Sequence, residues 1–338
     1  MAKRIGQYTI ELDRMPGIIG YGTAVGKKEG EGPIADEFDN IFEDTTMGLK
    51  SWEEAESALM TSAINSALTK AKITASDADG LFSGDLLDQS IATTFGVKDF
   101  ALPHIGLFGA CSTMALSLSL ASLMVDSGAM NCAIAATSSH FCSAERQFRF
   151  PLEYGGKRTP TSQWTVTGSG AVVVKAGGGA PFIKRVTLGK IVDFDVTDAN
   201  NMGAAMAPAA ADTLSGFLKD TNTKPEDYDA IFTGDLGQVG STLLKQLMTE
   251  KGYTLDENYN DCGLMIFDMS DSDVAAGGSG CGCSASVLCA HILKRIQSGE
   301  YQKVLFCATG ALMSPTSSQQ GKSIPGVAHL VEIVHNKG

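Results

Sequence analysis

Cys111 is the residue whose setting could most readily support covalent chemistry. Residues 105–112 read IGLFGACS, which predicts a short strand that turns sharply into a helix, with the cysteine at the turn. A thiol at a helix N-terminus lies at the positive end of the helix dipole, which favours the thiolate. The residues alone leave two interpretations open: a nucleophile, or a cysteine packed in a glycine-rich turn.

A cluster of basic residues gives a second chemical signal. Four basic residues fall within residues 146–158 of a chain whose net charge is −12. A guanidinium can bind a carboxylate through two parallel hydrogen bonds, so we expect Arg146 and Arg149 to bind an anion that carries two carboxylates. The alternative is a solvated loop in which the arginines pair with Glu145 and Glu153.

One histidine and two turn aspartates are further candidates. His140 is the histidine expected to face the same cleft, because it directly follows a predicted strand of the first half. Asp85 and Asp235 occupy equivalent Gly-Asp turns and are expected to approach each other near the cleft. They would suit a calcium ion carried by the ligand, although turn carboxylates more often accept hydrogen bonds from nearby backbone amides. The pair Cys281 and Cys283 lacks the spacing of a zinc site, so no metal site is expected.

The elements that must position these residues are repeated along the chain. Four segments recur in the same order: 81–86 in 231–236, 109–112 in 280–285, 132–137 in 304–310 and 168–174 in 325–331. Helical patterns lie at 51–71, where Ser51 and Glu54 form a capping box, and at 113–127, 209–219, 240–249 and 284–296. The alternation predicts a layered α/β protein of two related halves, 1–200 and 201–338, with a surface insertion at about 27–44.

Composition excludes several classes of protein. The net charge of −12 would repel nucleic acid, so we expect no nucleic-acid partner. The eight cysteines lie mostly in apolar runs and no secretory leader is visible, which indicates reduced, buried thiols. The most apolar stretch, residues 114–125, is shorter than the ~20 residues that span a bilayer. We therefore expect no signal peptide and no transmembrane helix, and any membrane contact should be peripheral.

The duplicated pattern and the cysteine at the first turn resemble the thiolases and β-ketoacyl synthases, which implies a five-layer αβαβα fold with pseudo-twofold symmetry. A closer resemblance, to the stage V sporulation protein AD family, is carried by residues 108–113, 136–140, 144–149, 153–156, 165–171, 205–213 and 261–264. Together these segments cover both halves of the chain.

The resemblance also implies what the chain lacks. Condensing enzymes use a histidine after the first strand of the second half, and a histidine or asparagine at its cysteine-equivalent turn. These positions fall on Gly234 or Asp235, and on Cys281 or an adjacent glycine. We therefore expect a protein that is not an enzyme, in which Cys111 is a vestigial nucleophile.

The resemblance implies that the ligand is dipicolinate (pyridine-2,6-dicarboxylate), alone or as its calcium chelate, with no other cofactor. The residues expected to contact it are Cys111, Ser112, His140, Arg146, Arg149, Glu153, Thr167, Asp85, Asp235 and Cys281. The same resemblance implies uptake of dipicolinate into the forespore and its release on germination, together with membrane channel subunits, from a peripheral position on the spore inner membrane.

Two other functions and one assembly remain open at this point. The chain could be an acyl-thioester-dependent acyltransferase or condensing enzyme with Cys111 as nucleophile and His140 as base. It could also be a structural scaffold in which Cys111 is inert. The resemblance to thiolase-like folds also leaves open a homodimer that pairs the strand at about 131–137.

Overall fold

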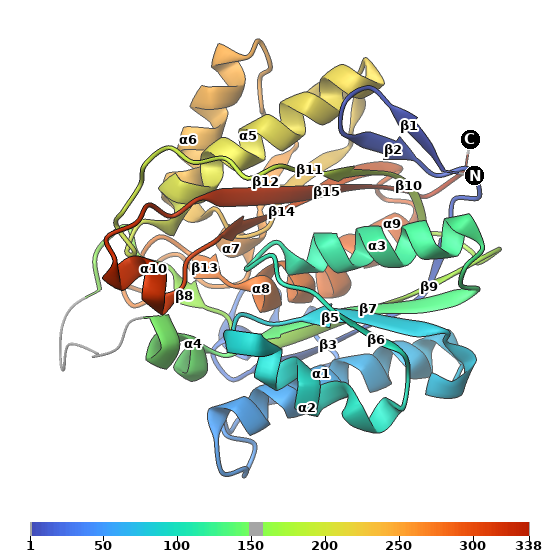
Figure 1. Ribbon diagram of the computed structural model, residues 1–338, viewed down its shortest axis with the longest axis horizontal. Helices are drawn as coiled ribbons and strands as arrows, with labels where there is room; N and C mark the ends of the chain where they lie inside the picture. Colours follow the sequence, from blue (N-terminus) through green and yellow to red (C-terminus); the bar gives the residue numbers. More distant parts are fainter. Residues whose placement is uncertain (1, 149–157, 338) are drawn as a thin grey trace.

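The chain folds into five alternating layers of helices and sheets (Figure 1). The computed structural model describes residues 2–148 and 158–337. Helices cover the outer face of each sheet, and a further layer of helices is packed between the two sheets. This is the αβαβα arrangement expected from the sequence.

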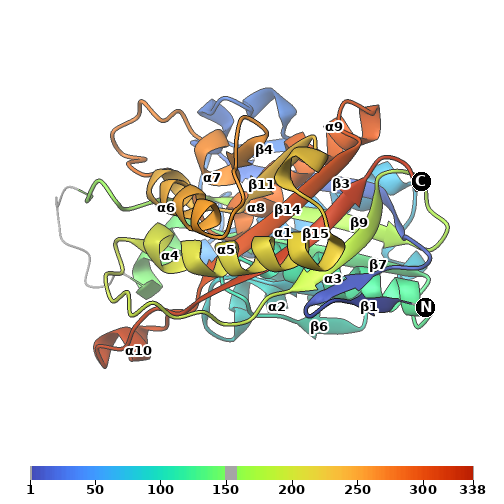
Figure 2. The same cartoon turned by 90° about the horizontal axis from the view of Figure 1, so that it is seen from above.

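The helices of the three helical layers have the following bounds. The first sheet is covered by α1 (Trp52–Ala71) and α2 (Ile91–Val97). The middle layer holds α3 (Thr113–Ser127) and the run α8 (Cys281–Val287), η7 (Leu288–Ile292, one π-helical turn) and α9 (Leu293–Ser298). The second sheet is covered by α5 (Met202–Thr221) and α6 (Gly237–Glu250), which lie across it in Figure 2. Shorter helices are α4 (Phe141–Phe148), α7 (Cys262–Met265) and α10 (Pro315–Gln319).

The strands form two sheet layers with the same strand order, and the single pair Gly17–Phe182 joins the two layers by hydrogen bonding. The first sheet runs β3 (Gly17–Gly26), β9 (Gly168–Lys175), β7 (Cys132–Ser139), β5 (Gly80–Gly84) and β6 (His104–Gly106). The second runs β10 (Phe182–Leu188), β15 (Gly326–Val334), β14 (Lys303–Ala311), β11 (Ala230–Thr233) and β12 (Tyr259–Asp261). Smaller strands are β1 (Lys3–Ile5), β2 (Thr9–Glu11), β4 (Asn40–Phe42), β8 (Trp164–Thr165) and β13 (Gly278–Ser279).

Strand directions repeat as well as strand order. In the first sheet β5 is parallel to β6 and β7, and β9 is antiparallel to β7 and β3. In the second sheet β11 is parallel to β12 and β14, and β15 is antiparallel to β14 and β10. The predicted duplication is therefore confirmed in the topology. Strand β10 precedes residue 200 in the chain but lies in the second sheet.

Helix α1 shows how a local signal fixes a layer. The Ser51 hydroxyl accepts a hydrogen bond from the Glu54 backbone N–H (3.2 Å), which is the predicted cap. The helix packs closely on β3, because a Cβ atom at Gly22 would lie 2.4 Å from the carbonyl oxygen of Ala63. The glycine allows the helix to approach the sheet, and this approach buries the small residues that recur every fourth position.

The middle layer contains the most apolar helix. Among the described residues, the window 110–127 is long and apolar enough to cross a membrane, but 72% of it is buried inside the structure. Helix α3 begins and ends where the sequence predicted. Helix α5 begins earlier than predicted, at Met202, because the Asn201 side chain caps it by accepting a hydrogen bond from Ala204 N–H.

The predicted insertion at 27–44 holds two short 3₁₀ turns and β4, and it is tied to the core. Glu29 is buried and its carboxylate accepts a hydrogen bond from the Thr167 backbone N–H (2.9 Å). Glu37 pairs with His291 and Arg295 on the helix run of the second half.

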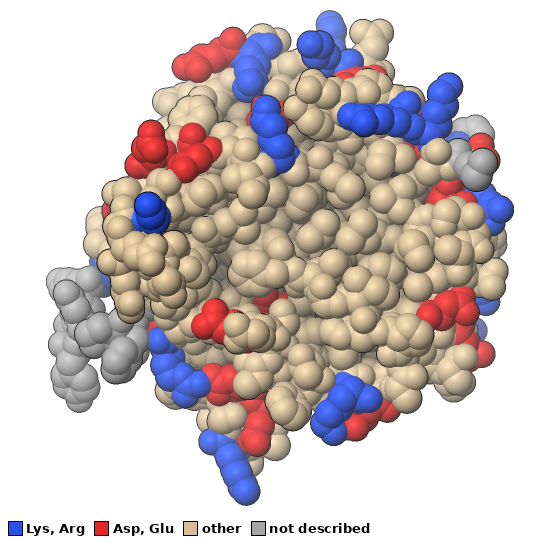
Figure 3. Space-filling view, viewed as in Figure 1, with Lys and Arg blue, Asp and Glu red and all other residues tan. Residues whose placement is uncertain are grey.

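The strand proposed for dimerisation lies inside the first sheet. Strand β7 pairs with β5 on one side and β9 on the other, so it has no free edge, and pairing of copies through residues 131–137 is excluded. The free edge is β6, which pairs only with β5 among the described strands. Strand β6 and α3 lie on the face shown in Figure 3, whose centre carries few charged side chains.

Candidate functional site

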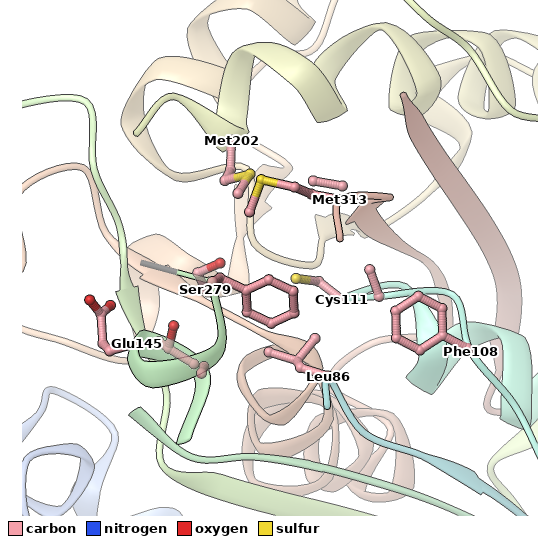
Figure 4. Close-up of a pocket in the computed structure, with 12 residues that line it drawn as sticks. Leu86, Phe108, Cys111, Glu145, Met202, Ser279 and Met313 are labelled. Carbon is pink, nitrogen blue, oxygen red and sulfur yellow. The ribbon is translucent and has the colours of Figure 1, made fainter. Parts of the chain in front are cut away.

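A pocket of about 60 Å³ lies beside Cys111, where the two halves meet. It is lined mostly by apolar side chains: Leu86, Phe108, Ala110, Cys111, Ala144, Glu145, Phe148, Thr165, Met202, Ser279, Ala311 and Met313. In Figure 4, Met202 and Met313 lie on one side of the cysteine, Leu86 lies on the other, and Glu145 lies at the far end. By the same measure a single water molecule occupies about 10–15 Å³, so the pocket suits a compact ligand.

The turn that carries Cys111 is tight and is supported from the other half of the molecule. Ala110 has a φ of 49°, a backbone conformation that favours glycine. The Ser112 hydroxyl donates to the Gly109 carbonyl (2.6 Å) and closes the first turn of α3. Strand β14 passes behind the turn at Gly310, where a Cβ atom would lie 2.2 Å from the Gly109 oxygen. Cys111 is held in this turn with 8% of its surface exposed.

Asp235, which directly follows the strand–turn of β11, is the acid whose charge acts on Cys111. Its carboxylate accepts hydrogen bonds from Gly280 N–H (2.8 Å), the Ser279 hydroxyl (3.2 Å) and the Thr309 hydroxyl (2.8 Å). The Cys111 thiol also acts on this carboxylate and lowers its pKa. Burial raises the pKa of Asp235 to about 6, while these donors act in the opposite direction.

The same surroundings raise the pKa of the Cys111 thiol, whereas the helix dipole alone would lower it. Burial, followed by the charge of Asp235, raises the pKa of Cys111 well above its ordinary value. The expectation of a thiolate from the helix dipole is therefore wrong, since desolvation and a neighbouring carboxylate outweigh it. Cys111 presents a neutral thiol to the pocket.

His140 does not line the pocket. Its Nδ1 accepts a hydrogen bond from Cys142 N–H (3.1 Å), which leaves Nε2 to donate to the Thr45 carbonyl oxygen (2.8 Å). Burial lowers its pKa, so the ring is neutral. The other four histidines, all in the described part of the chain, contact Ser83, Glu37, Gly189 and Ile296. None of the five is positioned to move a proton at Cys111.

The turn at Cys281 is the counterpart of the Cys111 turn and is closed. Cys281 is fully buried and its thiol donates to the Ser138 carbonyl oxygen (2.9 Å). It packs in one apolar cluster with Cys111 and Leu86, behind the pocket wall. A glycine follows at 282 because a Cβ atom there would lie 2.4 Å from the Gly168 oxygen.

Asp85 is also buried, but it serves its own turn. Its carboxylate accepts hydrogen bonds from the backbone N–H groups of Leu87 (2.8 Å) and Thr93 (2.7 Å). Glu56, which accepts from the Ser138 and Ser143 hydroxyls, is close enough to act electrostatically on it. Burial raises the pKa of both acids. The backbone-binding alternative is thus the one the structure supports for Asp85.

The chain is similar in sequence to a known protein family. A profile of the family "Stage V sporulation protein AD (SpoVAD)" matches residues 6–334. Stage V sporulation protein AD of Bacillus subtilis (strain 168) is 47% identical over 308 residues, which cover 91% of each chain. The chain belongs to the stage V sporulation protein AD family.

Solved structures with the same fold are more distant. 3-Oxoacyl-[acyl-carrier-protein] synthase III from Aquifex aeolicus VF5 is 15% identical with a TM-score of 0.59, and the match covers 94% of this chain and 99% of that one. Cerulenin-bound OleA from Xanthomonas campestris is 12% identical with a TM-score of 0.59, covering 96% and 98%. At these identities the likeness shows the fold alone. This member of the stage V sporulation protein AD family is a sporulation protein with a thiolase-like fold.

Of the two arginines predicted to bind the ligand, only Arg146 is among the described residues, and it is not in the pocket lining. Arg146 lies on α4, where it pairs with Glu53, stacks over Trp52 (5.3 Å) and has half of its side chain exposed. Helix α4 turns Arg146 outward, so its side chain does not line this pocket. Arg149 and Glu153 lie outside the described residues.

A different arginine reaches the pocket wall. Arg158 pairs with Glu145 (3.3 Å), which does line the pocket, and packs over Trp164 (5.4 Å). The sequence suggested Glu145 as a partner of the basic cluster but gave no sign that it faces the ligand site.

Two further predicted contacts lie behind the pocket wall. Ser112 is buried at the start of α3, and its hydroxyl is used within the turn. Thr167 accepts from Phe141 N–H (3.1 Å) through its hydroxyl and is not a lining residue. Of the predicted set, Cys111 lines the pocket, and Asp235 and Cys281 stand directly behind it.

The apolar walls were missed by sequence reasoning. Leu86, Phe148, Met202 and Met313 come from four separate parts of the chain and meet only in the folded protein. Phe108 is half exposed and lies three residues before Cys111. Its place beside the cysteine was the one feature of the sequence that could have marked it as a lining residue. Within the described residues no group of three or more His, Cys, Asp or Glu side chains could hold a metal ion.

Proposed function

We propose that the protein binds dipicolinate in the pocket beside Cys111 and does not transform it. The observation that carries this proposal is a compact, largely apolar pocket with a neutral thiol in its wall, in a member of the stage V sporulation protein AD family. Phe108 and Phe148 both line the pocket and offer aromatic faces to a planar pyridine ring.

The non-catalytic half of the proposal rests on Asp235 and the histidines. A condensing enzyme needs a neutral donor that stabilises an enolate, and a carboxylate beside the thiol opposes a developing negative charge. The alternative, an acyl-thioester acyltransferase or condensing enzyme, requires Cys111 as a thiolate with a base in reach. No histidine, among the described contacts, fills that role.

The charge of the pocket favours a neutral form of the ligand. Its described lining has one ionisable carboxyl, Glu145, which Arg158 already pairs. Asp235 lies behind the thiol. A bare dicarboxylate would meet little positive charge here, whereas the calcium chelate carries no net charge. We propose that calcium enters with the ligand.

The cellular role is proposed from family membership. It comprises uptake of dipicolinate into the forespore and its release on germination. The protein would act with membrane channel subunits, from a peripheral position on the spore inner membrane. The apolar surface of helix α3 is buried in the middle layer of the fold and is not exposed to a membrane. This supports assigning the membrane channel to other subunits.

Titration calorimetry tests the binding. Pyridine-2,6-dicarboxylate should bind, more tightly with calcium than without, and the 3,5-isomer should not. Met313→Trp fills the pocket and should abolish binding, while Met269→Trp places the same side chain at an exposed site and should leave it intact. Arg146→Ala should also bind normally. Binding that survives Met313→Trp in a folded protein would move the ligand elsewhere.

Mass spectrometry after incubation with acetyl and malonyl thioesters tests the enzymatic alternative. We expect no acyl adduct on Cys111. An adduct that turns over would replace the binding proposal with acyl transfer.

The homodimer stays a prediction, now assigned to another edge. Strand β6 contains no charged residue and could pair with its own copy about a twofold axis. The weakly charged face around it is where chains of net charge −12 can approach each other (Figure 3). Light scattering should give the mass of a dimer. Gly106→Pro removes an N–H that faces the free edge, because residues 105 and 107 bond to β5, and it should give the mass of a monomer.

A further inference from the structure

Asp235 sits at the focus of a set of hydrogen-bond donors beside the Cys111 thiol. Gly280 N–H and the hydroxyls of Ser279 and Thr309 point at its carboxylate from the second half. Ser279 lines the pocket together with Cys111, which places this carboxylate beside the thiol of the first half. The residue is fully buried. Convergent backbone and hydroxyl donors of this kind form an anion-binding site, and here the bound anion is a side chain of the chain itself.

We propose that Asp235 fills an anion-binding site built beside Cys111, so that Cys111 is a latent nucleophile silenced by an internal carboxylate. This inference is independent of which ligand occupies the pocket. Its test uses the ligand-free protein, so it can fail while dipicolinate binding stands, and the reverse.

The donors around Asp235 give the proposal its direction. Gly280 N–H and the Ser279 hydroxyl also act on the Cys111 sulfur, and both favour the thiolate. Asp235 takes up these donors and adds its own charge, which favours the thiol. Removing the carboxylate should therefore lower the pKa of Cys111 in two ways, by loss of repulsion and by release of donors.

The other titratable groups that act on this pair do not supply a compensating cation. They are Asp261 and Cys262 from β12 and α7, and Cys281 and Cys283 from α8. An Asp or Cys side chain is either neutral or negative, so none of these groups can supply a positive charge. Burial contributes most to the raised pKa of the thiol, and the further contribution of a nearby charge is assigned to Asp235.

A second consequence concerns the space that the carboxylate occupies. Replacing Asp235 with alanine leaves three fixed donors around a small cavity. A carboxylate the size of formate would satisfy them as Asp235 does. Formate should therefore restore the silent state in Asp235→Ala, but not in Asp235→Asn, where an amide fills the cavity.

The experiment measures the rate at which iodoacetamide alkylates Cys111, by peptide mass spectrometry, between pH 6 and pH 10. In both Asp235→Ala and Asp235→Asn the rate at pH 8 should rise at least tenfold, with the midpoint of the pH profile shifted to lower pH. Formate at about 0.1 M should slow Asp235→Ala towards the wild-type rate, compared with the same concentration of chloride.

Two references separate silencing from loosening of the fold. Asp85→Asn alters the equivalent turn of the first half and should leave the Cys111 rate unchanged. Cys142, which is partly exposed, should react at one rate in every variant. A rate in folded Asp235→Asn equal to that of the wild type would overturn the proposal, as would an equal rise in Asp85→Asn. Formate without effect on Asp235→Ala would remove the anion-binding half. Should Asp235→Ala fail to fold, Asp235→Asn alone decides the silencing.

Discussion

The equivalent aspartates of the two halves, Asp85 and Asp235, have different partners. Asp85 accepts two backbone N–H groups and holds the turn that leads into α2. Asp235 does not hold the turn that leads into α6. That task falls to Asp261 on β12, whose carboxylate accepts hydrogen bonds from Leu236 N–H and Gly237 N–H (2.9 Å each).

Sheet register explains how this difference arose. Asp261 pairs with Thr233 in the second sheet, and the matching position in the first sheet, opposite Ser83, is Gly106. A glycine cannot cap a helix with a side chain, so the first half must use Asp85. Because the Asp261 carboxylate on β12 holds the turn, the Asp235 carboxylate is not needed there. It lies instead toward Cys111, across the interface between the halves. A duplicated scaffold can thus change one site by moving a structural task to a neighbouring strand.

The largest expected effect comes from removing the Asp261 carboxylate, which holds the turn of the second half. Asp261→Ala removes a buried carboxylate that satisfies four donors, three backbone N–H groups and the Thr233 hydroxyl. Each buried donor left unpaired costs about 1–3 kcal/mol, so unfolding in urea should show a loss of about 4 kcal/mol or more. Asp85→Ala leaves two donors unpaired and should lose about half as much, within a range of about 2–6 kcal/mol. Equal losses in the two variants would argue against the transfer of the capping task.

The two cysteine turns differ in access, and thiol labelling sharpens that contrast. Cys111 borders the pocket, whereas Cys281 is fully buried and hydrogen-bonded to Ser138. Alkylation of Cys281 requires the fold to open, so Cys111 should react at least about a hundredfold faster in the native protein. Peptide mapping gives both rates in one experiment. Comparable rates would mean that the second turn opens readily.

Much of the fold could be predicted from the sequence because its signals are local. The Ser51 cap and the four-residue apolar spacing mark α1, and the repeated strand motifs mark both sheets. The Gly-Asp echo at 85 and 235 correctly indicated equivalent turns. It could not indicate their different partners, which depend on strands that pair at long range.

The site was harder to predict for the same reason. Arg146 was chosen for its charge, but the direction of its side chain depends on how α4 packs against Trp52 and Glu53. Cys111 was expected to be a thiolate because of its helix. Its pKa is instead raised by burial and then by the charge of Asp235, which is more than a hundred positions away in the sequence.

The titration of Asp235 gives a pH dependence with a definite sign. Burial raises its pKa in the folded state from 3.8 to about 6, so the folded protein binds the proton more tightly than the unfolded chain. The stability that the protonated form contributes is therefore present below about pH 4 and is lost as the pH rises through 6. Relative to Asp235→Asn, the wild type should lose roughly 2–3 kcal/mol of unfolding free energy between pH 4 and pH 7.

Urea unfolding at several pH values measures this difference, because the acids remote from Asp235 titrate equally in both proteins. Asp261, whose pKa is raised by the charge of Asp235, adds to the change in the same direction. Asp220 supplies a control of the opposite sign. Its pKa is lowered by backbone N–H groups of residues 7–9, which outweigh the effect of burial. Relative to Asp220→Asn, the wild type should therefore gain stability as the pH rises through the acid range. A flat difference for Asp235→Asn would mean that this carboxyl titrates normally.

The smallest expected effect separates the packing of the two turn cysteines. Cys281→Ala removes a fully buried sulfur and its hydrogen bond to Ser138, and the tight turn around Gly282 cannot close over the space. We expect a loss of about 1–2 kcal/mol, from the missing contacts and the small cavity. Cys111→Ala removes a sulfur that already faces an open pocket, so less packing is lost and the change should stay below about 0.5 kcal/mol. Thermal unfolding at pH 5, where Asp235 is largely protonated, keeps the carboxylate from adding to either value. A larger loss at Cys111 than at Cys281 would show that the thiol is structural, and the distinction between an open first turn and a closed second turn would then have to be abandoned.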